Sequence, residues 1–437
     1  MASFELKCVS WNILADGMSA NEFVTNGGDE TNTLWSSRFP RICSILKKFL
    51  EDKVHVIGLQ ENDHPYSILN DIQKFKPEIR CVHLITKGAA RSAYQNRLMG
   101  INDYLKSNDE AFTVQEAAVD KEQSNDVLYS KINQWYKTNS LAQIRKKFTM
   151  SSFKEESSDI LAKLLNRSMD DLYLANDGLT LYYDSNILEF VGPVPSSEMI
   201  ETEYPSLFMG HDLSCRFKIL DHSNTSNSTE LKFINIICTH LKSGEGMENE
   251  KRRCEQLSML LELVNCQSEP SVVLLDSNTS NLYKEEILKS NPNETSLVDN
   301  VIEETGFKNL VPTEGNECFK MRHAQGSQPK KFGNIMFDTI DKILVQSKYC
   351  IHFESSRPAW LKTLPQEYYE EVLSWRLDEA KRNELKRISI ENKWGDDMAN
   401  NGITGSIFNR SVFTHLYPNQ DMPSDHPPVM SRITFGF

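Results

Sequence analysis

The sequence contains no apolar run of about 18 residues, no Cys-x-x-Cys pair and no internal repeat. The first absence excludes an ordinary transmembrane helix. The second leaves nine scattered cysteines, which are typical of reduced thiols and not of a disulfide framework or a zinc ribbon. The start, MASFELKCVSWN, has no basic stretch followed by an apolar one, so no secretory signal is expected. We therefore expect an intracellular protein, cytoplasmic or nuclear.

Positive charge is also scarce, because the formal net charge is −13. This balance argues against a basic coat for nucleic acid and against docking on an anionic membrane. It is compatible with a local basic groove and with a site that collects divalent cations. Hydrophobic residues make up 39% and charged residues 25% of the chain, which is enough apolar material for a large core.

What the sequence does contain is a series of short apolar runs that end on polar residues. Such runs predict buried strands, and strand ends lie at the rim of a sheet, where polar side chains can converge. The runs are FELKCVSWN, ending on Asn12; VHVIGLQE, ending on Glu61; LKFINIICTH, ending on His240; SVVLLDSN, with Asp276 and Asn278; and FDTIDKILV, which contains Asp341. A last loop, MPSDHPPVM, places Asp425 and His426 just before the final alternating run.

Helical patterns lie between these runs and predict an α/β sandwich with the sheets inside and the helices outside. RICSILKKFLE follows Pro40, which we place near the first turn of its helix, and EKRRCEQLSMLLELV and YKEEILKS are further helices. The Ser/Asn-rich stretch 221–230 is predicted to be a hairpin loop. Residues 91–175 and 356–412 break the pattern, and we interpret them as helical insertions into one domain that spans residues 1–437.

Each polar residue, taken alone, has a plain structural explanation. Asn12 suits a turn, Glu61 a solvated strand end, and His240 a hydrogen-bonded structural histidine. Asp276 with Asn278 suits a helix cap or an Asx-turn. Asp341 is different, since a carboxylate inside a strand-like run is costly to bury without a partner.

Taken together, and in order, the blocks resemble the endonuclease/exonuclease/phosphatase superfamily, whose fold is that of deoxyribonuclease I. The blocks are SWNIL, LQE, DGLTLYY, THLKS, LLDSN, TIDKI and SDH. A finer resemblance is to the nocturnin, Angel and carbon-catabolite-repressor deadenylase branch, through WNILADG at 11–17, LWSSR at 34–38 and the pair Arg253 and Gln256. The superfamily implies a four-layered α/β/β/α sandwich of two packed mixed β-sheets flanked by helices.

The resemblance also implies roles for individual residues. His426 would act on the scissile phosphate and Asp341 would orient it. Glu61 would be the principal Mg²⁺ ligand, with Mn²⁺ as an alternative ion, and Asn12 and Asp425 would complete the metal set. The remaining catalytic and substrate-binding candidates are Asp276 for the attacking water, Asn278 and His240 for the phosphoryl oxygens, and Asn12, Arg253 and Lys242 for the substrate. The chain departs from the family pattern at Leu275, Ser277 and Lys342.

The resemblance favours a magnesium-dependent phosphodiesterase, of the 3′-5′ exoribonuclease, deadenylase-like kind, that hydrolyses single-stranded RNA to nucleotide monophosphates. Two alternatives stay open: hydrolysis of a small nucleotide such as NADP(H), with 91–175 as a lid, and an inactive binding platform. No leucine-rich-repeat docking module and no membrane partner are expected. Further basic candidates for a phosphate backbone are Arg38, Arg41, Arg252, Lys330, Lys331 and the run 144–147.

Overall fold

The computed structural model describes most of the chain outside the predicted insertions. The described residues are 3–15, 32, 35–62, 64–84, 178–194, 212–220, 232–244, 246–279, 281–292, 294–295, 297–312, 316–321, 335–355, 357–362, 364–378, 380–381, 383, 415 and 417–436. The segments 91–175 and 221–230, and most of 356–412, lie outside this set, so the single-domain boundaries and the hairpin loop remain predictions.

Two mixed six-stranded sheets form the centre of the fold. The first has the order β13-β14-β1-β2-β4-β3, from Cys350–Ser355, Val429–Gly436, Ser3–Asn12, Val56–Gln60, Leu179–Asp184 and Ile79–Leu84. The second has the order β5-β6-β7-β8-β12-β9, from Leu188–Pro193, Asp212–Ile219, Phe233–His240, Ser271–Asp276, Asp341–Gln346 and Phe307–Asn309. β1 runs parallel to β2, and β7 runs parallel to β8, whereas the other pairs are antiparallel.

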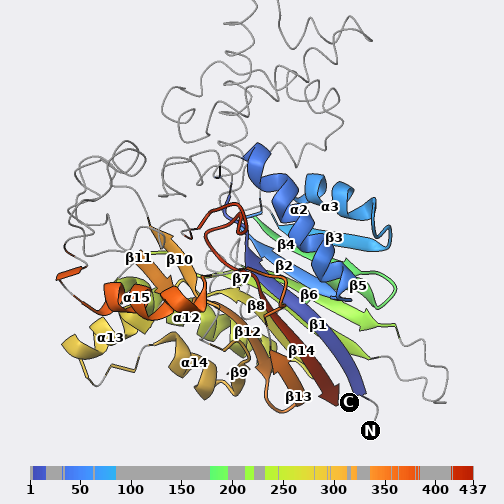
Figure 1. The fold of residues 1–437 in the computed structure, drawn as a ribbon. Helices are drawn as coiled ribbons and strands as arrows, with labels where there is room; N and C mark the ends of the chain where they lie inside the picture. The colour runs from blue at the N-terminus through green and yellow to red at the C-terminus, as the bar shows by residue number, and fades with distance from the viewer. Residues whose placement is uncertain are drawn as a thin grey trace, which may run out of the picture.

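Helices cover the outer faces of both sheets, which confirms the predicted four-layered α/β/β/α sandwich (Figure 1). The helices are α2 (Trp35–Glu51), α3 (Pro65–Gln73), α12 (Met247–Asn265), α13 (Asn281–Ser290), α14 (Val298–Glu304) and α15 (Gln366–Leu377). α2 and α3 pack on the first sheet, and α12 and α14 pack on the second. A separate two-stranded sheet, β10 (Cys318–Met321) with β11 (Ile335–Asp338), lies next to α15.

Strict alternation along the strands separates the inner core from the two outer ones. In β8, Val272 and Leu274 face the other sheet, whereas Val273 and Leu275 face α12 and α14. β1 follows the same rule, with Cys8 inside and Val9 outside. The alternation continues to the strand ends. The polar residue that ends a strand therefore points to the same face of the sheet as the residue two positions earlier.

Two element boundaries differ from the sequence prediction. α2 begins at Trp35, so Pro40 lies inside the helix and not in its first turn. The guanidinium of Arg38, which is fully buried in this early turn, donates to the carbonyls of Ile13, Leu14 and Pro423 and so holds the turn in place. A tertiary contact therefore extends the helix ahead of its proline.

The run FDTIDKILV is two strands and not one, because β11 ends at Asp338 and β12 begins at Asp341. The break is stabilised by β8, since both the backbone N–H and the hydroxyl of Ser277 donate to the carbonyl of Ile340. Asp341 consequently lies at a strand start, at the rim, and not within a strand.

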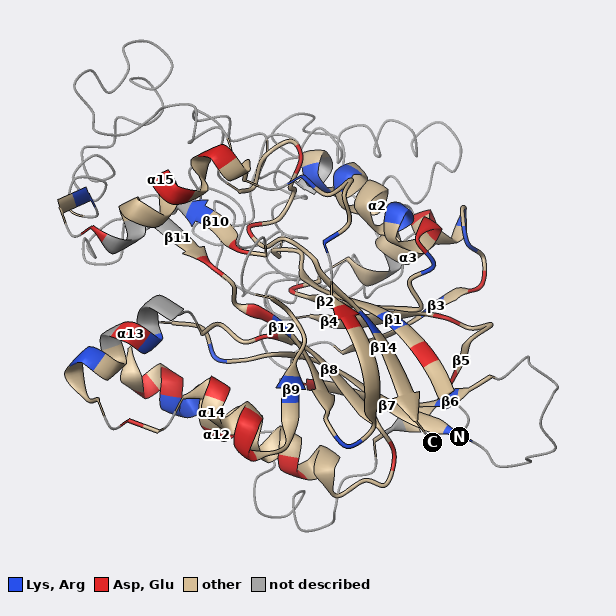
Figure 2. Ribbon diagram, turned by 60° about the horizontal axis from the view of Figure 1, so that its bottom comes forward, with Lys and Arg blue, Asp and Glu red and all other residues tan. Residues whose placement is uncertain are grey.

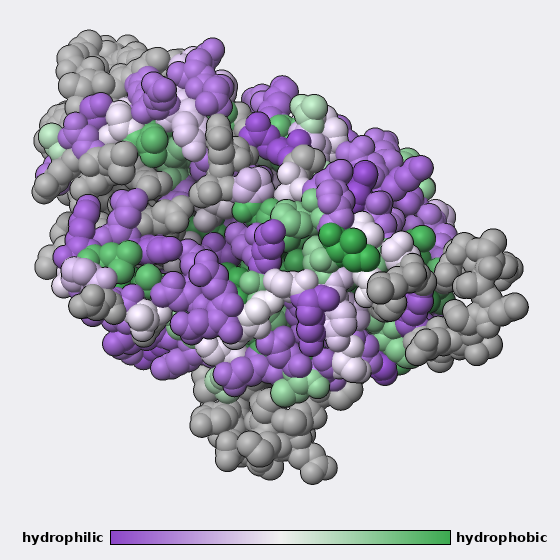
Figure 3. Space-filling model, turned by 90° about the horizontal axis from the view of Figure 1, so that it is seen from below, coloured by the Kyte–Doolittle hydropathy of each residue, from purple (hydrophilic) through white to green (hydrophobic). Residues whose placement is uncertain are grey.

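Most large apolar side chains among the described residues lie in these cores. Those that remain exposed are Phe75, Phe190, Val191 and Ile351. On the face shown in Figure 3, apolar colour is limited to small areas between hydrophilic ones. No helix in the described segments is long and apolar enough to span a bilayer.

Substitution of Gly58 would test the packing between the sheets. It lies on the inner face of β2, and a Cβ atom there would lie 2.6 Å from Cδ1 and 3.1 Å from Cβ of Leu274. We expect Gly58→Ala to destabilise the protein by about 1–3 kcal/mol in denaturant unfolding, because overpacking forces the sheets apart.

The double variant Gly58→Ala/Leu274→Ala provides the control. Leu274→Ala alone should cost about 2–5 kcal/mol, but it removes Cδ1 of Leu274, the nearest clashing atom, and keeps only the Cβ contact at 3.1 Å. The double variant should therefore be more stable than the sum of the single effects, with a coupling of about 0.5–3 kcal/mol. Additive effects would contradict this account of the inter-sheet contact.

Candidate active site

Alternation and register bring four predicted residues to one rim between the sheets. Asn12 ends β1 on the inner face of the first sheet. His240 ends β7, Asp276 ends β8 and Asp341 starts β12, all on the inner face of the second sheet. Asp276 is the cross-strand neighbour of both His240 and Asp341. Because each side chain lies on the face that meets the other sheet, the four converge.

Asn12 connects the two sheets at this rim. Its amide Nδ2 donates to Oδ2 of Asp276 at 2.8 Å and to Oε1 of Glu61 at 3.1 Å. Its Oδ1 accepts from the backbone N–H of Leu14 at 2.9 Å, and Oε2 of Glu61 accepts from the N–H of Ala15 at 3.0 Å. All of these groups are buried, so the sequence-predicted Asn12, Glu61 and Asp276 form one bonded cluster.

His426 and Asp341 form the second bonded unit of the rim. Nδ1 of His426 lies 2.9 Å from Oδ2 of Asp341, and both side chains are buried. The loop that carries the imidazole is fixed by Trp11, whose Nε1 donates to the carbonyl of His426 at 2.8 Å, and by Ser424, whose hydroxyl donates to the carbonyl of Asn12 at 2.6 Å. The predicted orienting partner of the imidazole is therefore in contact with it.

Sequence reasoning missed Lys320, which lies on β10 and is buried. Its Nζ lies 2.5 Å from Oδ2 of Asp425 and 3.1 Å from Nε2 of His426. The ammonium therefore bridges the two neighbouring residues of the terminal loop, and Asp425 has an ion-pair partner in addition to its predicted metal role. The available signal was a lysine within the otherwise apolar run CFKM, since a buried lysine requires a partner.

The protonation of His426 is set by the titratable groups around it. Burial disfavours the imidazolium, but Cys318, Asp341 and Asp425 outweigh burial and Lys320, so the pKa of His426 lies well above its usual range. The raised pKa favours a protonated Nδ1, which can donate a hydrogen bond to Asp341. Burial raises the pKa of Asp341, and the nearby imidazole partly opposes this.

Asp276 is shifted in the opposite direction. Burial favours its neutral form, but His240, His426 and the hydrogen bonds from Asn12 and from the N–H of Asn278 outweigh burial, so the pKa of Asp276 is lowered. Nε2 of His240 lies 3.5 Å from its Oδ2. Asp276 is therefore an anion at neutral pH, whereas the pKa of the neighbouring Asp341 is raised. Pairs of carboxyl groups whose pKa values are shifted in opposite directions are typical of acid–base sites.

Glu61 fits a divalent cation. Burial raises its pKa, and the neighbouring carboxylate of Asp425 raises it further, whereas His240, with Nε2 4.0 Å from Oε1, lowers it. A buried carboxylate close to a second one is unfavourable unless a cation compensates it. Oxygen donors from one or two carboxylates are what Mg²⁺ and Mn²⁺ prefer. Glu61, with Asn12 and Asp425 nearby, is thus suited to hold such an ion.

A second group of possible metal ligands consists of Cys318, Asp341 and His426. One donor atom each from Cys318, Asp341 and His426 lies within 4.8 Å of the others, the only such group of His, Cys, Asp or Glu in the described segments. A thiol and an imidazole are poor ligands for magnesium. This cluster is therefore separate in chemistry from the predicted set of Glu61, Asn12 and Asp425.

Backbone strain is found at the same rim. Glu61 has φ 53° and Asn278 has φ 50°, both in the left-handed region. This conformation costs about 1–3 kcal/mol for a residue that is neither glycine nor well suited to it, and such residues gather at functional sites. Asn278 uses its side chain to join two strand ends, since Nδ2 donates to the carbonyl of Leu241 at 2.9 Å. Its contact with a phosphoryl oxygen stays a prediction.

Arg253 and Lys242, the predicted substrate contacts, lie in different environments. Arg253 is fully buried, ion-paired with Glu250 at 2.7 Å, and donates to the carbonyls of Lys242 and Gly244. It thus stabilises the loop after β7 from inside the protein. This placement differs from the predicted contact with substrate. Lys242 is exposed on that loop. Arg38 is likewise buried against backbone carbonyls and faces no solvent.

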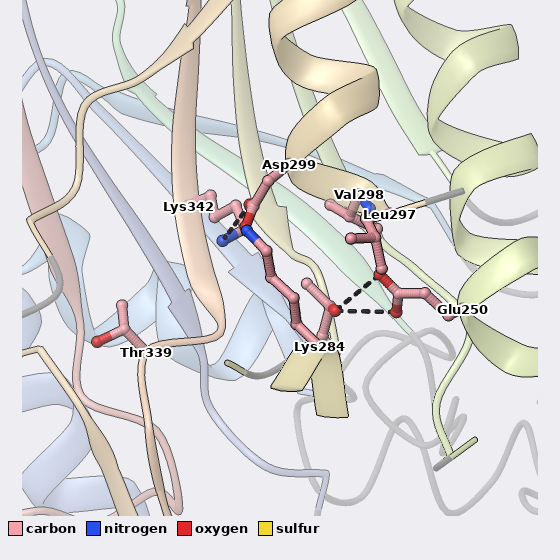
Figure 4. A pocket seen from close by; sticks show the side chains of 8 residues that line it. Glu250, Lys284, Leu297, Val298, Asp299, Thr339 and Lys342 are labelled. Carbon is pink, nitrogen blue, oxygen red and sulfur yellow. Dashed lines mark hydrogen bonds and ion pairs between the residues drawn. The ribbon is translucent and has the colours of Figure 1, made fainter. Parts of the chain in front are cut away.

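Glu250 anchors a second loop as well. Its carboxylate accepts from the hydroxyl of Thr279, at 2.9 and 3.0 Å, and from the N–H of Val298 at 3.1 Å. Figure 4 shows this carboxylate at one side of a small pocket, with Lys284 and Lys342 reaching Asp299 at the other. The pocket lies on the helix-covered face of the second sheet, so it is not the candidate active site.

The three family departures are sequence neighbours of the rim residues Asp276 and Asp341, but their side chains contact other groups. Leu275 packs against α12, Ser277 bonds to Ile340, and Lys342 pairs with Asp299 at 3.5 Å. In the view of Figure 2, basic residues predominate on α2 and acidic residues on α15, and no continuous basic face joins the outer helices among the described residues. Lys330, Lys331 and 144–147 lie outside the described residues.

Comparison with known proteins gives structural neighbours only. No model of a protein family and no curated protein matches the chain. Similar solved structures include the human nocturnin catalytic domain with bound sulfate (12% identity, TM-score 0.39, covering 100% of this chain and 97% of that one). They also include ANGEL2, a 2′,3′-cyclic phosphatase, with adenosine-2′,3′-vanadate (13%, 0.43, 100% and 97%). An endonuclease/exonuclease/phosphatase family protein from Bacteroides thetaiotaomicron is a third (11%, 0.42, 100% and 100%).

These names include the superfamily and the nocturnin and Angel branch that the sequence motifs resemble. Because the identities and TM-scores are low, the chemistry proposed below rests on the side-chain geometry of this chain.

The raised pKa of Glu61 leads to a stability prediction. A carboxyl group whose folded pKa is raised stabilises the fold fully below its unfolded pKa, and this contribution is lost as pH rises through the folded pKa. In cation-free protein, Glu61→Gln should therefore melt at a higher temperature than wild type at neutral pH, and the difference should vanish in acid. Differential scanning calorimetry in chelator measures both.

Magnesium should reverse this order. At 100 times its dissociation constant a bound cation stabilises a protein by about 2.7 kcal/mol, and Glu61→Gln should gain much less than wild type. Glu5→Gln, at an exposed site on β1, is the matched control and should respond as wild type does. An equal magnesium gain in Glu61→Gln would exclude Glu61 as a ligand.

The two neighbours of the His426 ring should shift its pKa in opposite directions. Asp341 raises this pKa and Lys320 lowers it. In cation-free protein, Asp341→Asn should lower the pKa and Lys320→Gln should raise it, as measured by NMR titration of the ring with His426→Asn for assignment. Shifts of the same sign in both variants would contradict the described contacts.

Proposed function

We propose that the chain is a divalent-cation-dependent phosphoester hydrolase. The observation that carries the proposal is the convergence, at one buried rim, of polar side chains from distant parts of the chain, bonded as two units. The units are Asn12 with Glu61 and Asp276, and Asp341 with His426. Oxygen ligands for a cation, an anionic carboxylate and an imidazole with a raised pKa side by side are the groups that phosphoryl transfer requires.

In the proposed reaction each side chain acts through the property described above. Asp276, an anion with a lowered pKa, accepts a hydrogen bond from the attacking water and aligns it. His426, with a raised pKa, donates a proton or hydrogen bond to the oxygens of the phosphoryl group, and Asp341 holds the ring in orientation. His240, beside Glu61 and Asp276, donates to the same oxygens.

A cation at Glu61 would polarise the phosphoryl group and neutralise its developing charge. Lys320 forms an ion pair with Asp425 and so keeps the terminal loop positioned before substrate binds.

The substrate we propose is single-stranded RNA, attacked from a 3′ end to release nucleotide monophosphates. The motifs WNILADG, LWSSR and THLKS, which resemble the deadenylase branch, support this choice. The exposed Lys242 beside the rim provides a cation for a neighbouring phosphate. A small nucleotide such as NADP(H) is the competing substrate, and the experiment below separates the two.

The test incubates the protein with magnesium or manganese and poly(A), mixed RNA, single-stranded DNA, NADPH or inositol phosphates, and identifies the products. We expect release of AMP from poly(A), abolished by chelator and slowed about 10²–10⁴-fold in Asp276→Asn. Asp299→Asn, on the outer face, should retain wild-type rates.

Release of phosphate from NADPH without cleavage of RNA would contradict RNA as the substrate and would support the hydrolase activity. A wild type as inactive as Asp276→Asn on every phosphoester would contradict the enzyme and favour a binding platform.

A further inference from the structure

A buried thiol lies beside the His426–Asp341 pair, and it has no place in the proposed reaction. Cys318 is fully buried on β10, and its Sγ lies 3.8 Å from Oδ2 of Asp341. The same oxygen lies 2.9 Å from Nδ1 of His426. One donor atom from each residue lies within 4.8 Å of the others. Sulfur, nitrogen and oxygen donors from three separate segments thus lie close together.

These donors suit zinc better than magnesium. Thiolate, imidazole and carboxylate bind Zn²⁺ at about 2.3, 2.0–2.1 and 2.0–2.2 Å. In a tetrahedral site such bonds place sulfur about 3.6 Å and nitrogen about 3.4 Å from the oxygen. The observed separations from the Asp341 oxygen, 3.8 and 2.9 Å, require shifts of about half an ångström or less. A small opening of the His426–Asp341 pair would bring both separations to these values.

Asp341 provides a second, independent indication. Its Oδ1 is buried and has no hydrogen-bond partner among the described residues, although the side chain is fully buried. A buried carboxylate oxygen without a donor is unfavourable. A metal ion bound by this carboxylate would compensate it, whichever oxygen is the ligand.

We propose that Cys318, Asp341 and His426 form a site for Zn²⁺, distinct from the oxygen-rich site at Glu61, and that zinc bound there inhibits the protein. Only the inhibition rests on the proposed function. Binding replaces the thiol proton of Cys318 and the proton held between His426 and Asp341, and both are released to solvent. Zinc then occupies the imidazole and the carboxylate that the reaction uses, while the Glu61 site stays intact.

The direct test measures binding without activity. Full-length protein, stripped with chelator and reduced, is titrated with Co²⁺, and a cobalt–thiolate absorption band is recorded, followed by displacement with Zn²⁺. We expect the band in wild type and in Cys266→Ser/Cys350→Ser, which lacks an exposed and a half-buried thiol outside the site. We expect no band in Cys318→Ala.

Zinc affinity should fall in Cys318→Ser by more than the about 10–100-fold that loss of a supporting hydrogen bond costs at a metal site. The serine keeps the size of the side chain, and circular dichroism melts check that each variant folds. A band that survives Cys318→Ala and disappears in Cys266→Ser/Cys350→Ser would overturn the proposal, as would its absence from wild type.

The second test compares activity within each variant, as the ratio of rates with and without zinc at fixed magnesium. Zinc should inhibit wild type and the Cys266→Ser/Cys350→Ser variant, and the half-inhibitory concentration should rise by more than tenfold in Cys318→Ala. Equal inhibition of Cys318→Ala would refute the inhibitory role. A protein without hydrolase activity would still be tested for the zinc site by the cobalt titration, so the two proposals fail separately.

Discussion

The hydrogen bond between Asp341 and His426 is the contact on which the site depends, because it joins the two sheets at their common rim. Asp341 begins β12 in the second sheet, and His426 precedes β14 in the first. The bond from Asn12 to Asp276 makes the same connection a short distance away. Burial gives both bonds their importance, since carboxylates removed from water must find donors or cations. The sandwich thus holds its buried charged groups at the rim, where polar groups of one sheet compensate those of the other.

The pattern of the pKa values follows from this arrangement. Asp276 and Asp341 are cross-strand neighbours, and like charges in that position repel each other. The two imidazoles and the amide of Asn12 lower the pKa of Asp276, whereas burial raises that of Asp341. Asp276 is therefore favoured as an anion, whereas Asp341 shares a proton with the ring of His426. Backbone strain at Glu61 is maintained by the bonded cluster around it, as expected where a site is held rigid before it binds.

The sequence allowed the sheets and much of the site to be predicted, because the signal was periodic and local. The run ending at Asn12 alternates, and those ending at His240 and Asp276 are continuous apolar runs typical of buried strands. In all three strands, side chains point to alternate faces up to the last residue. Lys320 could not be placed, since its partners Asp425 and His426 are separated from it by 105 and 106 positions. The resemblance to the nocturnin branch predicted that Arg253 meets substrate. Its burial depends on Glu250 and on loop carbonyls, and side-chain type alone does not show that such contacts are satisfied internally. The start of α2 was missed for the same reason, through the buried contacts of Arg38.

The most direct test of the central claim is the position of manganese in a crystal, located by its anomalous scattering, together with the orientation of the residues around it. The account predicts one ion bound to the carboxylate of Glu61, at the rim where His426 and Asp341 remain hydrogen-bonded. An ion bound elsewhere with Glu61 turned away, or an Asp341 side chain that does not contact the His426 ring, would contradict it.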